Sequence, residues 1–117
     1  MKANELRIGN WIECKFGNTQ IHCIDTESVE YDTFAEYIKD IKPIPLTEQW
    51  LLDFGFDKMN TEYSKGYYFY NDETLRIDHG NECYFDIPCK YVHTLQNLYF
   101  ALTGEELIYL KCTDSDK

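Results

Sequence analysis

This chain has few basic side chains and no long apolar run. Its 117 residues include 11 Lys and Arg against 21 Asp and Glu, a formal net charge of −10. Binding nucleic acid directly requires a basic surface that displaces counterions from phosphate. Anionic membranes attract the same kind of surface. The sequence therefore predicts no direct nucleic-acid partner and no membrane partner.

Export and insertion signals are also missing. No stretch reaches the roughly 20 apolar residues that cross a bilayer. The opening sequence, MKANELRIGN, lacks the apolar core of a secretory signal peptide. We therefore expect a cytoplasmic protein.

The cysteines show neither a disulfide framework nor a metal-binding pattern. Their number is odd, no C-x-x-C pair occurs, and the three histidines stand at no zinc-like spacing from them. We therefore expect reduced thiols, no metal and no cofactor. The five are Cys14, Cys23, Cys83, Cys89 and Cys112.

Recognisable catalytic motifs are absent as well, since no GxSxG, Walker, Rossmann or HExxH pattern occurs. The sharpest enzymatic candidate pairs Cys89 with His93, because Lys90 and a helix start could lower the thiol pKa. The alternative, which we favour, is that the two residues only flank a helix terminus. We therefore expect a non-enzymatic protein and leave an enzyme as the alternative.

Aromatic and apolar residues are plentiful. Hydrophobic residues make up 44% of the chain and aromatic residues 16%, a composition that disordered chains do not have. The length suits one domain, 1–117, with residues 112–117 as a frayed polar tail.

The N-terminal part is typical of short strands. Over Trp11–Ile24, apolar residues alternate on either side of Gly17-Asn18, which predicts a hairpin that pairs Ile12 with Cys23 and Cys14 with Ile21. A small curled sheet of the SH3-like kind often begins in this way. A further short strand is expected near Ser28–Tyr31, followed by a loop or a helical turn.

Two prolines make Ile41–Leu46 an extended connector or edge. A short helix is then predicted over Glu48–Phe54. Thr47 is its expected N-cap, and Gly55 its expected end, with Phe56 folding back on the helix in a Schellman-type ending.

A three-stranded antiparallel meander is predicted over Tyr63–Ile87. A second turn at residues 80–82 pairs Ile77 with Phe85 and Leu75 with Ile87 on one face. Leu107–Leu110 is expected to add a final strand.

The longest helical pattern lies in Lys90–Leu107 and stops at Gly104. Its expected core-facing residues are Tyr91, Val92, Leu95, Leu98, Tyr99 and Leu102. Together these elements predict an α+β fold: an N-terminal β-hairpin sheet, a short capped helix, an antiparallel meander and one longer helix packed on the sheet.

Three segments of the sequence stand out together: LRIGNWI at Leu6–Ile12, PIPLTEQWLLDFGF at Pro43–Phe56 and KYVHTLQNLYFALTGEEL at Lys90–Leu107. They comprise 39 of the 117 residues. In this order they resemble a family of small uncharacterised proteins encoded by phages, prophages and mobile elements of gut anaerobic bacteria. The resemblance implies a bacterial mobile-element setting, but the family has no assigned activity, so no residue role can be transferred.

Two groups of residues are candidates for an interaction surface. Tyr67, Tyr68 and Tyr70 flank Phe69 in a strand with aromatic residues on both faces, so that one set is available to a partner unless both faces are covered. The second group lies in the acidic segment Asp25–Asp40, where carboxylates could mimic nucleic acid or simply form a solvated surface. These acids are Glu27, Glu30, Asp32 and Glu36.

We therefore expect a non-enzymatic accessory protein of a mobile element that binds another protein or itself. One alternative is a small ligand-binding domain or enzyme with a pocket between the long helix and the meander. Another is an acidic DNA mimic that inhibits a host protein.

Overall fold

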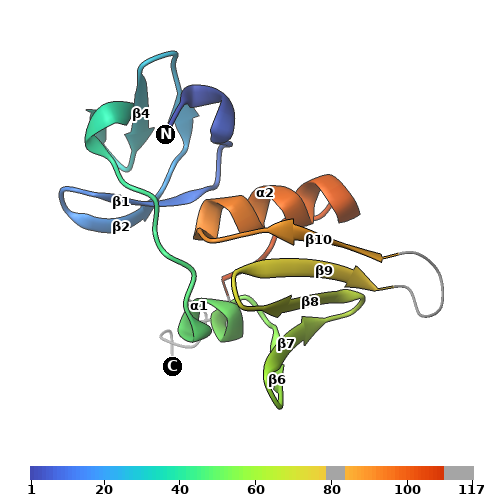
Figure 1. The fold of residues 1–117 in the computed structure, drawn as a ribbon. Coiled ribbons are helices and arrows are strands. Elements are labelled where there is room, and N and C mark those ends of the chain that lie inside the picture. Colours follow the sequence, from blue (N-terminus) through green and yellow to red (C-terminus); the bar gives the residue numbers. More distant parts are fainter. Residues whose placement is uncertain (79–83, 110–117) are drawn as a thin grey trace. The chain divides into compact units, whose positions relative to one another are not determined.

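The computed structural model describes residues 1–78 and 84–109 (Figure 1). The chain divides into two compact units. The first unit combines Met1–Pro45 with Tyr91–Glu105, and the second combines Leu46–Lys90 with the segment that begins at Glu106. The first unit is therefore assembled from segments far apart in the sequence. That all 117 residues form one domain stays a prediction.

Short antiparallel strands build the first unit. β1 pairs with β2 in a hairpin, and β3, β4 and β5 form a second sheet in that order. The strand expected near Ser28–Tyr31 is confirmed as β4, and a 3-10 turn follows after one further strand. The bounds are η1 Ala3–Glu5, β1 Trp11–Cys14, β2 Gly17–Gln20, β3 Cys23–Ile24, β4 Ser28–Tyr31, β5 Phe34–Tyr37 and η2 Ile38–Asp40.

The predicted hairpin is present, but its turn lies two residues earlier than predicted. The turn is Lys15-Phe16 rather than Gly17-Asn18, because Cys14 pairs with Gly17. Gly17 has a φ of 111°, in the left-handed region that other residues rarely adopt. The glycine is therefore needed directly after the turn, as in hairpins where a left-handed residue follows a type I turn.

The earlier turn changes every predicted pair of the hairpin. Ile12 pairs with Thr19 instead of Cys23, and Cys14 no longer pairs with Ile21. Ile12, Cys14 and Ile21 are nevertheless all buried, as their alternation predicted, whereas Cys23 is exposed. An SH3-like closure of these strands stays a prediction.

The predicted long helix is confirmed as α2, Val92–Thr103, which contacts β1 within the first unit. It ends at Gly104, whose φ is 78°, as the sequence predicted. Burial of α2 differs from the prediction. Tyr91 and Leu102 are partly exposed, while two polar residues, His93 and Gln96, are buried beside Val92 and Leu95.

The proline-containing segment Ile41–Leu46 is an extended connector, as predicted. Lys42 exchanges two backbone hydrogen bonds of 2.9 Å with Glu13. The carbonyl of Ile44 accepts a hydrogen bond from the N–H of Val92 at 2.9 Å. The connector thereby joins β1 to the start of α2.

The second unit begins with α1, Glu48–Asp53. Its predicted Schellman ending is confirmed: the N–H of Phe56 donates to the carbonyl of Leu51, and the N–H of Gly55 to that of Leu52, both at 3.0 Å. Thr47 occupies the N-cap position, but its side chain caps none of the described N–H groups, contrary to the prediction.

The predicted meander is part of a larger antiparallel sheet, which over the described residues runs β10-β9-β8-β7-β6. Ile77 pairs with Phe85 and Leu75 with Ile87, as the alternation of apolar residues predicted. The three predicted strands correspond to β8, β9 and β10, whereas β6 and β7 were not predicted as strands. The predicted turn at residues 80–82 lies outside the described residues. The strands are β6 Asp57–Met59, β7 Glu62–Lys65, β8 Tyr68–Asn71, β9 Thr74–Asp78 and β10 Tyr84–Pro88.

The end of the chain differs from the prediction. Residues 107–109 are described and do not form the expected final strand. Leu107 is instead buried, and the ring of Tyr109 packs 5.0 Å from that of Trp50. Leu110 and the predicted tail at 112–117 lie outside the described residues. With antiparallel sheets and two α-helices in the described ranges, the α+β class is confirmed.

Candidate functional site

Cys89 lies in surroundings that oppose nucleophilic chemistry. Its side chain is fully buried in the second unit, and burial raises the pKa of the thiol to about 12. A reactive cysteine needs the opposite shift, because the thiolate is the nucleophile. The backbone around it has a structural role, since the carbonyl of Cys89 accepts a hydrogen bond from the hydroxyl of Tyr70 at 2.8 Å.

His93 belongs to the first unit and is buried on α2. Burial lowers the pKa of its imidazole, while the nearby Glu5 carboxylate raises it and the chain's amino terminus lowers it. The ring stacks on Tyr91 with centroids 6.0 Å apart. Among the described residues, none forms a hydrogen bond with Nδ1. His93 also lines a shallow groove of about 450 Å³ with Glu5, Thr94, Asn97, Leu98 and Ala101.

The predicted tyrosine surface is only partly exposed. Tyr68 and Tyr70 pair with Ile77 and Leu75 and therefore share their face of the sheet. Tyr70 is buried, and desolvation raises the pKa of its phenol to about 12. Tyr68 is half-buried, whereas Tyr67, just before β8, is exposed.

The predicted acidic residues do not form one continuous face. Glu30 pairs with Ala35 on one face of the β3–β4–β5 sheet, while Glu36 pairs with Val29 on the other. Glu36 also accepts a hydrogen bond from the hydroxyl of Tyr31. This distribution resembles a solvated acidic surface more than the regular charge spacing of nucleic acid.

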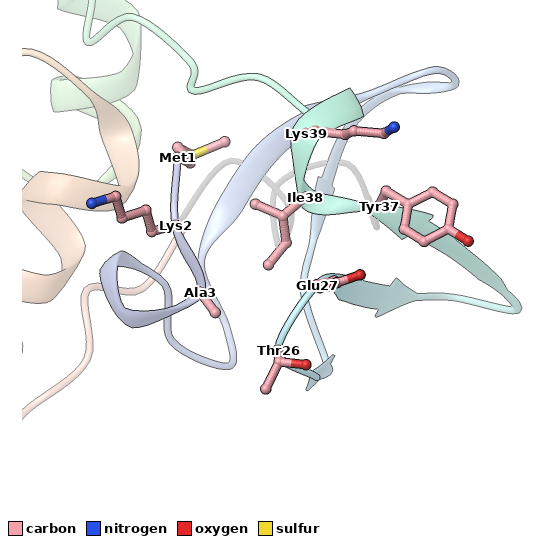
Figure 2. A pocket seen from close by; sticks show the side chains of 8 residues that line it. All are labelled: Met1, Lys2, Ala3, Thr26, Glu27, Tyr37, Ile38 and Lys39. Carbon is pink, nitrogen blue, oxygen red and sulfur yellow. The ribbon is translucent and has the colours of Figure 1, made fainter.

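Glu27 lines a surface hollow of about 610 Å³ (Figure 2). The charged side chains that line this hollow do not point toward one another. In Figure 2, the Lys2 side chain extends away from Tyr37 and Lys39, which point to the opposite side. A site that recognises one small ligand requires polar groups aimed at the same point. The lining residues are Met1, Lys2, Ala3, Thr26, Glu27, Tyr37, Ile38 and Lys39.

An exposed aromatic pair in the first unit was not predicted. Phe16, in the β1–β2 turn, is 63% exposed, and Phe34, which opens β5, is 45% exposed. Their ring centroids are only 4.6 Å apart. A turn at Gly17-Asn18, as predicted, would have left Phe16 in the first strand, whereas the observed turn at Lys15-Phe16 brings its side chain to the surface.

A small pocket of about 200 Å³ lies at this aromatic pair. Tyr31 forms its buried side, with its ring centroid 6.1 Å from that of Phe34. Asp32, an acidic residue at the β4–β5 turn, also lines the pocket, and its backbone carbonyl is 2.9 Å from Nε2 of His22. We name this pocket the aromatic-pair pocket; its lining is Cys14, Phe16, Asn18, Thr19, Tyr31, Asp32 and Phe34.

The second unit has a polar cluster on the face of its sheet opposite to that of Tyr70. The guanidinium of Arg76 donates to Glu62 with its shorter contact at 2.8 Å and lies 4.8 Å from the ring centroid of Phe69. The guanidinium of Arg76 and the ring of Phe69 thus contact each other within the second unit. This cluster is a structural ion pair of the sheet.

Metal-binding groups and membrane-spanning helices are absent from the described part of the chain. No three His, Cys, Asp or Glu side chains in residues 1–78 and 84–109 are arranged to hold a metal ion. No helix in these ranges is both long and apolar enough to cross a membrane. Comparisons with protein-family models, with curated proteins and with solved structures give no match.

Proposed function

We propose that this protein is a non-enzymatic accessory protein of a phage or another mobile element, which acts in the cytoplasm by binding another protein. The contact between the exposed rings of Phe16 and Phe34 carries the proposal. Aromatic side chains gathered on a surface are typical of binding sites, because they bury a large apolar area at little entropic cost.

The position of these rings supports an interaction surface. Phe16 lies in the β1–β2 turn and Phe34 directly follows the β4–β5 turn, so the backbone of each hairpin holds one ring. A surface fixed by two short turns is largely preformed, which lowers the entropic cost of binding. The resemblance of three sequence segments to mobile-element proteins supports the biological setting.

The chemistry of Cys89 and His93 supports a non-enzymatic role. Burial raises the pKa of the Cys89 thiol to about 12, which keeps it protonated at neutral pH. Burial also lowers the pKa of the His93 imidazole, and Nδ1 has no hydrogen-bond partner among the described residues to orient it. Catalytic bases are usually oriented by a third group.

Affinity capture with two matched variants tests the proposal. The tagged protein would be incubated with reducing lysate of a gut anaerobe, and retained proteins identified by mass spectrometry. Phe34→Ser removes one ring of the pair, whereas Tyr37→Ser removes a ring that is 58% exposed on the same strand. We expect a stoichiometric partner that is retained by the wild type and by Tyr37→Ser but lost with Phe34→Ser.

Two results would contradict this function. One is recovery of the bait alone at moderate salt. The other is a partner that Phe34→Ser retains as well as the wild type does, which would place binding elsewhere on the surface. Thermal unfolding of both variants would verify that each remains folded.

A further inference from the structure

We propose that the aromatic-pair pocket recognises a cationic side chain, Lys or Arg, projecting from the partner protein. This inference rests on the proposed function and adds the chemistry of the contact. Aromatic rings attract cations through the negative potential of their faces, and groups of rings are used to hold ammonium groups.

Aromatic rings, which attract cations, line the pocket. Phe16, Tyr31 and Phe34 provide three rings, with neighbouring centroids 4.6 and 6.1 Å apart and interplanar angles of 42° and 36°. The rings of Phe16 and Phe34 are both exposed, and the buried ring of Tyr31 lies behind that of Phe34. The two exposed rings can therefore both contact one guest.

Carboxylates supply complementary charge. Asp32 lines the pocket itself. Glu36 accepts the hydrogen bond of the Tyr31 hydroxyl, which shifts electron density into that phenol ring and strengthens its attraction for a cation. The chain's formal net charge of −10 adds long-range attraction for a basic partner.

The size of the pocket fits the end of a side chain. Its volume of about 200 Å³ is below the range of about 300–1,000 Å³ that is common for pockets that hold a whole small molecule. An ammonium or guanidinium group with part of its aliphatic stem matches this space. A nucleotide or a helix does not.

A cation of the protein itself already lies beside one ring. Nζ of Lys15 is 5.4 Å from the centroid of Phe16, within the distance at which cation–π attraction acts. Lys15 should therefore compete with a guest and repel it. Its removal should increase the affinity, which is the opposite of what a general loss of surface contacts would do.

Titration of the ¹⁵N-labelled protein with short peptides tests the inference. The probes are acetyl-Gly-Arg-Gly-amide, its lysine counterpart, and acetyl-Gly-citrulline-Gly-amide, in which the side chain has nearly the shape of arginine but no charge. We expect saturable shifts of the Phe16, Thr19 and Asp32 amides with a cationic peptide. Binding of the citrulline peptide should be about tenfold weaker.

Three variants separate the aromatic contribution from general charge attraction. Phe34→Leu keeps an apolar residue but removes the ring and should weaken binding by about fivefold. Tyr37→Leu is the matched control and should leave the affinity unchanged. Lys15→Met should tighten binding by about twofold or more.

The inference is overturned if arginine and citrulline peptides bind equally, or if the shifts are spread over the acidic surface and unaffected by Phe34→Leu. That failure is distinct from failure of the proposed function. If a partner is captured through Phe34 but the pocket shows no preference for charged peptides, the proposed protein interaction stands and cation recognition is overturned. If the pocket selects charged peptides but no partner is captured, cation recognition stands and the proposed function is contradicted.

Discussion

The backbone N–H of Trp11 donates a 2.8 Å hydrogen bond to Oε1 of Gln96, 85 positions later in the chain. Nε2 of the same side chain donates to the carbonyl of Gly9 at 3.0 Å. The carboxamide of Asn10, fully buried, lies in the same network. One buried glutamine therefore satisfies two backbone groups of the N-terminal segment and joins α2 to β1.

Gln96→Leu should destabilise the protein by about 1–2 kcal/mol, because the partly buried N–H of Trp11 would lose this acceptor, and the carbonyl of Gly9 would lose one donor and keep that of Gln20. Urea unfolding followed by circular dichroism would measure the change. Gln49→Leu on α1 is the control, since Gln49 is exposed and its side chain donates a 2.9 Å hydrogen bond to Asp53 along the surface of the same helix. Equal stability of the wild type and Gln96→Leu would contradict this role of Gln96.

Glu73→Gly should stabilise the β8–β9 hairpin. Asp72 and Glu73 form its two-residue loop, with φ values of 52° and 61°. This left-handed conformation costs a residue other than glycine about 1–2 kcal/mol of folding free energy. Glycine avoids that cost, but its greater conformational freedom in the unfolded chain offsets part of the stabilisation. We expect a net gain of about 0.5–1 kcal/mol in unfolding free energy. Glu30→Gly within β4 should instead lower stability.

Acid should destabilise the first unit through His93. Burial lowers its folded-state pKa below the ordinary value of 6.5, so the unfolded chain binds more protons in the interval between the two pKa values. The stability contributed by neutral His93 is therefore present above pH 6.5 and is lost as pH falls through the folded-state pKa. Among the groups facing the imidazole, Glu5 opposes this shift, and the amino terminus reinforces it.

Unfolding free energies between pH 7 and 5 would measure the effect in the wild type and in His93→Gln, which stays neutral throughout. The variant should show the flatter dependence. Parallel curves would indicate that the pH dependence arises from other groups, chiefly the carboxylates.

The described cysteines should differ in reactivity. Cys23 is exposed, whereas Cys14 and Cys89 are buried free thiols. Iodoacetamide at mildly alkaline pH should label Cys23 first, with Cys89 slower by about a hundredfold or more, because its raised pKa leaves little thiolate. Peptide mass mapping would give each rate. Loss of the difference in denaturant would attribute it to burial, whereas rapid labelling of native Cys89 would contradict the structure.

Local signals in the sequence predicted much of the architecture. The ends of both α-helices could be placed because Gly55 and Gly104 are needed where φ is positive. The pairing of Ile77 with Phe85 followed from alternation, since a register change would bring the wrong face to the core.

Features that depend on contacts between residues distant in the sequence could not be predicted in the same way. Gln96 looks like a surface residue of a helix until the backbone of Gly9 and Trp11 is brought to it. Gly17 was recognised as a turn residue, but its left-handed conformation belongs after the turn, and this shift is what exposes Phe16. The aromatic-pair pocket could not be predicted either, because it forms where two hairpins meet in the folded unit.

Photocrosslinking at the aromatic pair would test directly whether the rings of Phe16 and Phe34 contact a partner protein. A benzoylphenylalanine residue would replace Phe34 in one protein and Tyr37 in another, and both would be irradiated in the same lysate. We expect a discrete protein adduct from position 34 that an excess of the arginine peptide suppresses and the citrulline peptide does not. Adducts from position 37 alone, or equal adducts from both positions that neither peptide affects, would contradict it.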